Sequence, residues 1–314
     1  MAQIERMINT GPHVIDATTP AGLDRLLAGI EPARVVLIAG PTAAGKSALA
    51  LRIAQETGRA VVNADALQVW SCWRVLTARP SAQDEAAVPH LLYGHVAPGR
   101  SYSVGDWLAE VGALLRTGRG LVIAGGTGLY LSALTRGLAV IPPVPPEIRA
   151  QGDGWLAHDG GLAGMIAALD PRTRAGLDLR NPARVQRAWE VLAATGRGLA
   201  DWQADTPPPL VAPEQAQRFV LQMDRNLLAE RIARRFDAML DEGALDEVRA
   251  MLPRWDPRAQ WARAIGAAEL AGHLSGRLTL AEARERAVIA TRQYAKSQRI
   301  WFRNRMRDWT NLLV

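Results

Sequence analysis

Eight consecutive residues near position 40 have the spacing of a loop that binds phosphate groups. The pattern G-x-x-x-x-G-K-S contains two glycines, which let the backbone curl so that its N–H groups face phosphate oxygens. In such a loop the lysine reaches the terminal phosphate and the serine hydroxyl binds Mg²⁺, so Ser47 is the predicted Mg²⁺ ligand. The predicted phosphate-binding residues are Gly40, Pro41, Thr42, Ala43, Ala44, Gly45, Lys46 and Ser47.

The lysine of this loop is unusual in the composition of the chain. Only two of the 37 Lys and Arg residues are lysines, Lys46 and Lys296. A bias this strong is typical of the base composition of the coding DNA rather than of function. An ammonium group is more compact and more strongly hydrated than a guanidinium, and Lys46 stands at the one position where the loop requires lysine.

Two further apolar runs end in residues that bear on the chemistry. Residues 60–65 read AVVNAD and end in a carboxylate, Asp65. Residues 121–126 read LVIAGG and end in glycines, where an ordinary P-loop hydrolase places the acidic residue that helps to hold Mg²⁺. The residues alone therefore indicate a P-loop protein with an atypical second half, and a small-molecule kinase or NTPase is one interpretation.

Strand and helix patterns alternate around these residues. Short apolar runs typical of buried strands cover 34–39, 60–65, 121–126 and 217–223, and the patterns from residue 226 onward are helical. Strands that alternate with helices form parallel sheets covered by helices. We therefore predict an α/β fold with a P-loop NTPase-like parallel sheet core flanked by helices, an all-helical insertion and a helical C-terminal region.

Two proline clusters divide the chain into parts. Prolines cannot continue helices or central strands, so such clusters mark joints. We expect the first part of the core at 34–136, a helical insertion at 137–205 and a second, mostly helical part of the core at 206–314. Residues 1–33 are expected to be an N-terminal extension with one helix over 21–30.

The charge and the composition limit the class of protein. A formal net charge of +6 favours an anionic partner such as a nucleic acid or a phosphorylated substrate. The sequence has no run of 18 apolar residues and no signal-peptide pattern, so we expect a cytoplasmic protein with no membrane partner. The single cysteine, Cys72, excludes an intrachain disulfide.

Seven motifs occur in a fixed order: GPTAAGKS, NADALQVWSCWRVLTARP, PHLLYGHV, YSVGDW, GGTGLYLSAL, NPARVQRAWEVL and ATRQYAKSQRIWFR. Together they resemble the tRNA dimethylallyltransferase family, whose members are also called tRNA isopentenyltransferases. The similarity runs from about Val35 to the C-terminus. The resemblance implies transfer of a dimethylallyl group from dimethylallyl diphosphate to N6 of the adenosine immediately 3′ of the anticodon.

The resemblance implies roles for three catalytic residues. Asp65 matches the family aspartate that contacts the target amine, where a base assists a weak nucleophile. Thr127 matches a threonine that lines the channel where the base meets the diphosphate, and Arg235 matches an arginine on the diphosphate. The phosphate loop then binds the donor diphosphate together with Mg²⁺, because the leaving group gains negative charge.

The resemblance also implies an anticodon stem-loop as partner, with the target base flipped out of its stack. Gln68 could form two hydrogen bonds with an adenine edge, and the basic residues could bind phosphates. The helical insertion is expected to bind the tRNA, and a monomer is the default expectation. The implied tRNA-binding residues are Asp65, Ala66, Leu67, Gln68, Thr127, Arg149, Ala183, Arg184, Val185, Gln186 and Arg187.

The C-terminal segment interleaves basic and aromatic residues, a composition that suits single-stranded RNA. The alternative is a solvated helix with a buried aromatic stripe. The set comprises Arg292, Lys296, Arg299, Arg303, Arg305 and Arg307 with Tyr294, Trp301 and Phe302.

The chain departs from the family pattern mainly in segments that would touch or support RNA. The diphosphate half of the pattern is intact, so the identity of the RNA is less determined than the chemistry. A non-catalytic tRNA-binding relative of the enzymes therefore stays open as a second alternative. The departures include Ala66, Trp70, Cys72, Arg74, Leu76 and Ala183.

Overall fold

The computed structural model describes residues 14–314, and the chain divides into two compact units. An α/β unit contains residues 14–135 together with residues 211–314. A helical unit contains residues 136–210. Residues 1–13 of the expected N-terminal extension lie outside the described part of the chain.

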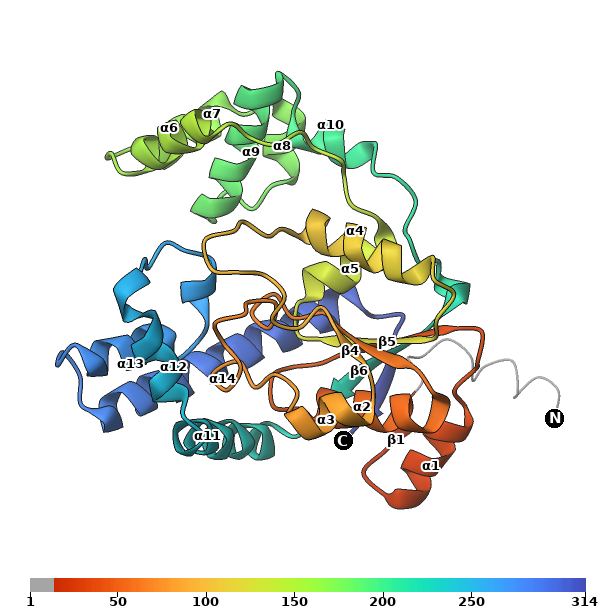
Figure 1. The fold of residues 1–314 in the computed structure, drawn as a ribbon. Coiled ribbons are helices and arrows are strands. Elements are labelled where there is room, and N and C mark those ends of the chain that lie inside the picture. The colour runs from red at the N-terminus through yellow and green to blue at the C-terminus, as the bar shows by residue number, and fades with distance from the viewer. Residues whose placement is uncertain (1–13) are drawn as a thin grey trace. The chain divides into compact units, whose positions relative to one another are not determined.

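The α/β unit is built on a sheet of seven strands in the order β1-β7-β6-β2-β5-β3-β4 (Figure 1). Every neighbouring pair is parallel, which confirms the predicted parallel sheet. The strands are β1 (Val14–Asp16), β2 (Val35–Ala39), β3 (Ala60–Asn63), β4 (His90–Leu91), β5 (Leu121–Gly125), β6 (Ala216–Gln222) and β7 (Thr310–Leu313).

Helices connect and cover the strands of this unit. Those before residue 137 are α1 (Pro20–Ala28), α2 (Lys46–Thr57), α3 (Ala82–Ala87), α4 (Val104–Leu115) and α5 (Gly128–Arg136). Those after residue 210 are α11 (Arg225–Asp241), α12 (Ala244–Met251), α13 (Ala267–Leu274) and α14 (Leu280–Arg305), with the short 3-10 turns η2 (Pro213–Gln215), η3 (Leu252–Arg254) and η4 (Trp261–Arg263).

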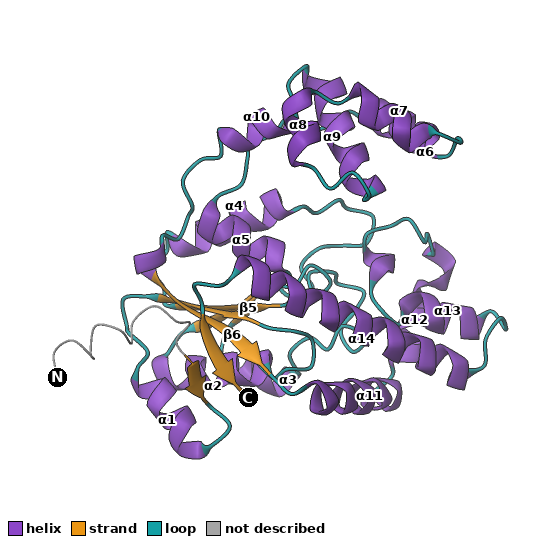
Figure 2. Ribbon diagram, turned by 180° about the vertical axis from the view of Figure 1, so that it is seen from behind, coloured by secondary structure: helices purple, strands orange, loops and turns teal. Residues whose placement is uncertain are grey.

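The central strand β2 is buried on both faces of the sheet. Successive side chains of a strand point to opposite faces. Val36 and Ile38 belong to the core cluster that includes α2, whereas Leu37 and Ala39 belong to the cluster that includes α4 and α5. Figure 2 shows α1 and α2 on one side of the sheet and α4 and α5 on the other. Burial on both faces explains the continuous apolar run of this strand.

The edge of the sheet differs from the sequence expectation. The expected extension contributes β1, and the C-terminal region, expected to be helical from residue 226 onward, ends in β7. The two strands pair with each other, with Ile15 opposite Leu312, and β7 pairs with β6. Neither VID nor TNLL is a continuous apolar run like that of β3, and both are too short to show an alternating pattern, so only their tertiary pairing reveals them.

The helical unit has a small core of its own. Its helices α7 and α9 pack together, and the fully buried members of the core include Met165, Val185 and Ala188. The helical insertion that the sequence predicted at 137–205 lies within this unit. The sequence patterns did not predict the first and the last helix of the unit. The helices are α6 (Pro146–Leu156), α7 (Gly161–Ala168), α8 (Pro171–Gly176), α9 (Pro182–Thr195) and α10 (Leu199–Ala204).

The longest described helix is α14, with 26 residues. It carries many charged side chains, so its composition is unlike that of a bilayer-spanning segment. Among residues 14–314, no helix combines the length and the hydrophobicity that crossing a membrane requires.

Candidate active site

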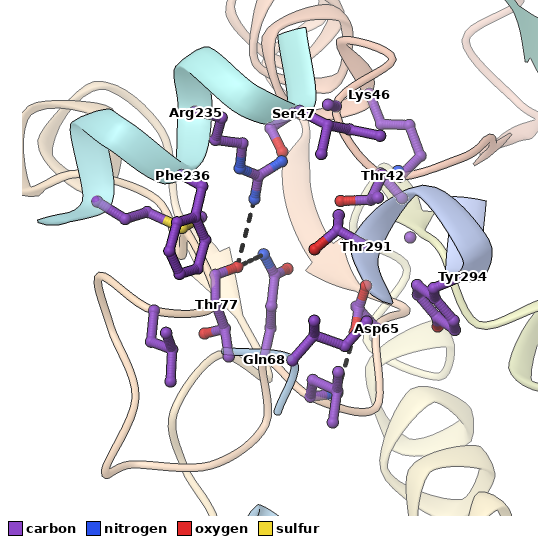
Figure 3. Close-up of a pocket in the computed structure, with 18 of the residues that line it drawn as sticks. Thr42, Lys46, Ser47, Asp65, Gln68, Thr77, Arg235, Phe236, Thr291 and Tyr294 are labelled. Carbon is purple, nitrogen blue, oxygen red and sulfur yellow. Dashed lines mark hydrogen bonds between the residues drawn. The ribbon is translucent and has the colours of Figure 1, made fainter. Parts of the chain in front are cut away.

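A cavity lies at the carboxyl ends of β2, β3 and β5, the edge where ligands bind in open α/β sheets. The phosphate loop, the end of β3, α11 and α14 all contribute side chains to its lining (Figure 3). The cavity therefore gathers residues that are separated by up to about 250 positions in the sequence. Its polar lining includes Thr42, Lys46, Ser47, Asp65, Gln68 and Arg235.

The phosphate loop has the curled backbone that its glycines predict. Gly45 has a φ of 94° and Ala43 has a φ of 63°, so both residues occupy the left-handed region. Gly40 is also required sterically, because an added Cβ would lie 2.9 Å from the Cβ of Leu221. The helix α2 begins at Lys46, so its positive N-terminal end faces the loop. The geometry is that of an anion-binding loop.

Two cations line the cavity, Lys46 at the end of the phosphate loop and Arg235 on α11. Burial lowers the pKa of the Lys46 ammonium to about 8, the Asp65 carboxylate opposes this shift, and the Arg235 guanidinium adds to it. Burial also lowers the pKa of Arg235, again opposed by Asp65. The Nζ atom of Lys46 donates to the carbonyl of Pro41 at 2.8 Å. Two desolvated cations that line one cavity favour an anionic ligand with more than one negative charge.

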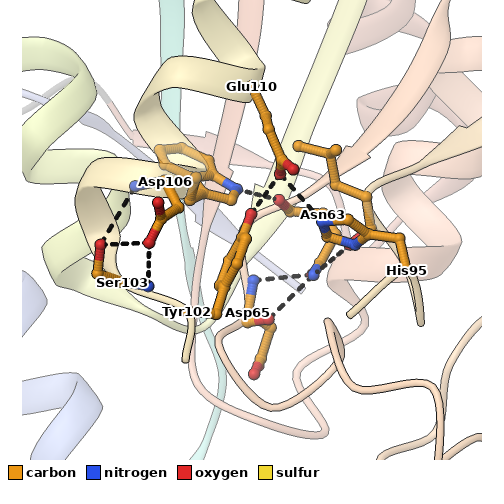
Figure 4. A network of polar contacts seen from close by, with 9 residues as sticks. Asn63, Asp65, His95, Tyr102, Ser103, Asp106 and Glu110 are labelled. Carbon is orange, nitrogen blue, oxygen red and sulfur yellow. Dashed lines mark hydrogen bonds and ion pairs between the residues drawn. The ribbon is translucent and has the colours of Figure 1, made fainter. Parts of the chain in front are cut away.

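Asp65 is held at the end of β3 by hydrogen bonds with the side chain of Asn63 and with the backbone N–H of Leu67. Asn63 Oδ1 accepts the N–H of Asp65 at 2.8 Å, and its Nδ2 donates to the carbonyls of Asp65 and Leu92. The carboxylate Oδ1 of Asp65 accepts the N–H of Leu67 at 3.0 Å. Trp107 donates its indole N–H to the carbonyl of Asn63 (Figure 4). The carboxylate therefore enters the cavity with a defined orientation.

Thr127 braces the segment after Asp65. Its N–H donates to the carbonyl of Ala64 at 3.1 Å, and its Oγ1 accepts the N–H of Ala66 at 2.9 Å. Neither Thr127 nor Ala66 is among the residues that line the cavity, whereas Leu67 is. The predicted contact between Thr127 and substrate stays a prediction, and the structure adds a positioning contact.

Gln298 of α14 joins two of the loops, a role that sequence reasoning missed. The residue is buried. Its Oε1 accepts the N–H of Thr42 in the phosphate loop at 2.9 Å, and its Nε2 donates to the carbonyl of Gly126 at 2.9 Å. The motif ATRQYAKSQRIWFR contains this glutamine, but its spacing gives no sign of a contact 256 residues away.

Gln68 has hydrogen-bond partners within the protein. Its Nε2 donates to the carbonyls of Thr77 and Ala78, at 2.8 and 3.0 Å. Both hydrogens of the amide are therefore used within the protein, and the expected contact with an adenine edge stays a prediction. Arg235 also donates from Nη2 to the carbonyl of Thr77, at 3.5 Å. Figure 3 shows Gln68 and Arg235 meeting at this one carbonyl.

One wall of the cavity is apolar, and the sequence had not named its residues. Ile232, Phe236 and Met239 of α11 line it together with Leu76 and Ile265. The three α11 positions share a helical face with Arg235, because residues three and four apart lie side by side. The spacing in LLAERIARRFDAML was therefore the available signal. The cavity has a cationic end and an apolar end.

The residues predicted to bind RNA in the helical unit differ in exposure. Ala183, Arg184 and Arg187 on α9 are exposed, as is Arg149 on α6. The side chain of Val185, in contrast, is fully buried in the core of this unit, so its expected contact with RNA stays a prediction.

Gln186 and Glu190 of α9 form a hydrogen bond with each other, and Gln186 also bonds to Asp153 of α6. Gln186 donates from Nε2 to the carboxylates of Asp153 and Glu190, at 2.6 and 3.1 Å, so its amide nitrogen is used within the unit. Burial raises the pKa of Glu190, and the nearby Arg149 and Arg187 oppose this shift. These two arginines therefore lie near one carboxylate on neighbouring helices.

The C-terminal residues that interleave in the sequence separate in space. Tyr294 lines the cavity, and Phe302 is buried in the core. Trp301 packs against Gly128, where an added Cβ would meet the indole ring. The expectation of a mixed basic and aromatic RNA surface is therefore wrong for the aromatic residues. The cations instead line a groove between α11 and α14, which includes Arg225, Arg292, Lys296, Arg299, Arg303 and Arg307.

The described residues contain no group of three or more His, Cys, Asp or Glu side chains placed to hold a metal ion. The donors that face the loop are the hydroxyls of Thr42 and Ser47 and the carboxylate of Asp65. Mg²⁺ keeps several waters and commonly takes one or two protein ligands together with phosphate oxygens. The donor set of the cavity fits a cation that arrives with a diphosphate.

Comparison with known families accounts for this combination of features. The model of the IPP transferase family matches residues 68–305, and that of isopentenyl transferases matches residues 33–92. The chain belongs to the IPP transferase family. The resemblance found in the seven sequence motifs is thereby confirmed.

Curated relatives of this IPP transferase family member cover nearly its whole length. It is 69% identical over 289 residues to a tRNA dimethylallyltransferase of Paracoccus denitrificans, which covers 90% of this chain and 96% of the relative. It is 61% identical over 292 residues to a tRNA dimethylallyltransferase of Cereibacter sphaeroides, with 93% of each chain covered.

Solved structures share its fold. The tRNA isopentenylpyrophosphate transferase of Bacillus halodurans matches with a TM-score of 0.64 and 30% identity, over 90% of each chain. A eukaryotic dimethylallyltransferase that acts on tRNA matches with a TM-score of 0.74 and 24% identity, over 89% of this chain and 73% of that one, which supports the fold alone.

Proposed function

We propose that this protein transfers a dimethylallyl group from dimethylallyl diphosphate to N6 of the adenosine immediately 3′ of the anticodon in certain tRNAs. The observation that carries this proposal is the two-ended cavity. A phosphate loop with two cations, a fixed carboxylate and an apolar wall line the same space. A kinase or NTPase would also use the loop and the cations, whereas the apolar wall in the same cavity suits the hydrocarbon tail of a prenyl donor.

The donor diphosphate binds at the cationic end. The N–H groups of the loop and the N-terminus of α2 receive the phosphate oxygens. Lys46 and Arg235 supply positive charge where the leaving diphosphate gains negative charge. The five-carbon tail lies against the wall formed by Ile232, Phe236 and Met239. The donor is thereby held with its reactive carbon between the two ends.

Mg²⁺ is the proposed cofactor, and the hydroxyl of Ser47 would hold it. It would neutralise charge on the leaving diphosphate.

The acceptor adenine enters beside Asp65. Its N6 forms a bond to C1 of the dimethylallyl group while the bond between C1 and the diphosphate oxygen breaks, and the released pair of electrons stays on diphosphate. A proton of the amine passes to the carboxylate of Asp65, whose Oδ1 is fixed by the N–H of Leu67. The products are N6-dimethylallyladenosine and diphosphate. Thr127 holds the adjoining segment through the N–H of Ala66.

The tRNA partner is supported by exposed cations in both units. The helical unit, proposed to be the tRNA-binding insertion, presents Arg149, Arg184 and Arg187. In the α/β unit, the groove beside α14 offers Arg292, Lys296 and Arg299 along one helical face. Contacts of this kind bind phosphates and position an RNA without reading its sequence.

The test is incubation of the protein with dimethylallyl diphosphate, Mg²⁺ and unmodified tRNA that has adenosine 3′ of the anticodon. Digestion and mass spectrometry should find dimethylallyladenosine at that position. Folded protein that binds tRNA yet forms no such product would contradict the proposal and favour a non-catalytic relative. ATP turnover without tRNA would favour a kinase or NTPase instead.

A further inference from the structure

Glu247 lies on α12, outside the lining of the cavity. Its Oε1 accepts the backbone N–H groups of Arg74 and Val75, both at 2.8 Å, and its Oε2 accepts that of Leu76 at 2.9 Å. Three consecutive amides thus converge on one carboxylate, as they do in backbone anion nests. Hydrogen bonds to an ionised acceptor are stronger than neutral ones. The side chain is the main polar anchor of this loop to α12.

The anchored loop carries two parts of the donor site. Leu76 contributes its buried side chain to the apolar wall. The next residue, Thr77, presents the carbonyl that accepts hydrogen bonds from Gln68 at 2.8 Å and from Arg235 at 3.5 Å. The position of the Arg235 guanidinium therefore depends on a carbonyl one residue beyond the amides that Glu247 holds.

The loop needs an external anchor because its own backbone is strained. Ala78 has a φ of 47°, in the left-handed region that disfavours residues with a Cβ. Strain of this kind persists only where surrounding contacts determine the conformation. The indole of Trp73 donates to the carbonyl of Trp261 at 2.8 Å, which fixes the start of the loop. Glu247 fixes the middle of the loop, directly before the carbonyl of Thr77 that contacts Arg235.

We propose that Glu247 is a positioning residue for prenyl transfer. It holds residues 74–76 so that the carbonyl of Thr77 orients Arg235 toward the donor diphosphate and Leu76 closes the apolar wall. This inference rests on the proposed function of the cavity. Glu247 touches neither substrate, so its effect must pass through Arg235 and the wall.

The test compares Glu247→Gln with a matched control. Glutamine keeps the size of the side chain but replaces one acceptor oxygen with an NH₂ group, which cannot accept an amide N–H. Asp84→Asn is the control, because Asp84 also accepts hydrogen bonds, from the N–H and the hydroxyl of Ser81, at 3.0 and 2.8 Å. Those bonds stay within one exposed helix cap and do not lead to Thr77.

We expect Glu247→Gln to lower kcat about tenfold while KM for tRNA changes less than twofold, and Asp84→Asn to leave both within twofold. In an Arg235→Lys background, Glu247→Gln should add less than a further twofold loss, because coupled residues are not additive. Thermal unfolding of each variant checks folding. A kcat for Glu247→Gln within twofold of wild type, or effects that multiply with those of Arg235→Lys, would overturn the inference.

Binding of methyl diphosphate, measured by calorimetry, separates this inference from the proposed function. Wild-type protein that forms no prenylated tRNA would refute the function. The affinity for methyl diphosphate then decides the positioning claim: a loss of about fivefold in Glu247→Gln supports it, and an unchanged affinity refutes it.

Discussion

The two ends of the cavity are built in different ways. Most of its cationic end comes from one continuous segment, residues 40–47, whose backbone itself forms the binding site, and Arg235 of α11 adds a second cation. Its apolar end is assembled from Leu76, Ile265 and three residues of α11, which lie far apart in the sequence. The continuous end can be read from a motif. The assembled end exists only once the loop and the helices are packed.

This difference predicts how each end responds to mutation. A change in the phosphate loop removes a contact that no neighbour can replace, because the curled backbone of the loop itself forms the anion-binding site. A change in the apolar wall removes buried area from several residues at once, and the others can partly compensate. The largest effects should therefore fall on the polar residues and the smallest on distant exposed cations.

Asp65→Asn gives the largest expected loss. The amide keeps the size of the carboxylate but cannot accept the proton from the adenine amine, so kcat should fall at least about a hundredfold. The affinity for dimethylallyl diphosphate should change little, which calorimetry can check. Wild-type turnover in this variant would remove Asp65 from the mechanism.

The lowered pKa of Lys46 predicts that the activity falls as the pH rises, which gives the pH profile a descending limb. Its pKa of about 8 means that the free enzyme loses this charge as the pH rises through 8. The kcat/KM for the donor should therefore be full below pH 7 and fall toward a tenfold loss per pH unit above 9. Lys46→Arg should lower activity but remove this limb, since guanidinium stays protonated. A limb that is the same in both proteins would mean that another group titrates.

Phe236→Leu tests the apolar end. The substitution shortens a buried side chain of the wall, so the affinity for dimethylallyl diphosphate should fall about fivefold through lost apolar contact. The affinity for methyl diphosphate, which has no tail, should change less than twofold. Equal losses for both ligands would show that Phe236 supports the fold rather than the tail.

Arg187→Ala should have the smallest effect. Arg187 is exposed on α9, and one lost phosphate contact should weaken tRNA binding only about threefold and reduce the slope of its salt dependence. The kcat at saturating tRNA should not change. A binding curve identical to that of wild type at several salt concentrations would exclude Arg187 from the RNA surface.

The sequence predicted most of the sheet and the polar centre because those signals are local. The strands β2, β3, β5 and β6 contain apolar runs, Asp65 lies two residues after the end of β3, and Lys46 and Ser47 belong to the loop motif that follows β2. A pattern that repeats over a few residues reports which side chains share a face. It does not report which distant element that face meets, so the short strands β1, β4 and β7 were missed.

The remaining site residues depend on contacts that no local pattern encodes. Gln298 reaches the phosphate loop across 256 positions, and Glu247 reaches Arg74 across 173. Gln68 has the chemistry to pair with adenine, but in the structure its Nε2 donates to the carbonyl of Thr77. Val185 lies between the exposed residues Arg184 and Arg187 in the sequence, but its side chain points into the core, because consecutive residues of a helix point in different directions.

The central claim is that one cavity holds a diphosphate at one end and a five-carbon tail at the other. Calorimetric titration of the wild-type protein with dimethylallyl diphosphate and with methyl diphosphate, in the presence of Mg²⁺, tests it most directly, because the two esters carry the same charge. Burial of the tail against the wall predicts at least about tenfold tighter binding of dimethylallyl diphosphate. Equal affinities would contradict the claim.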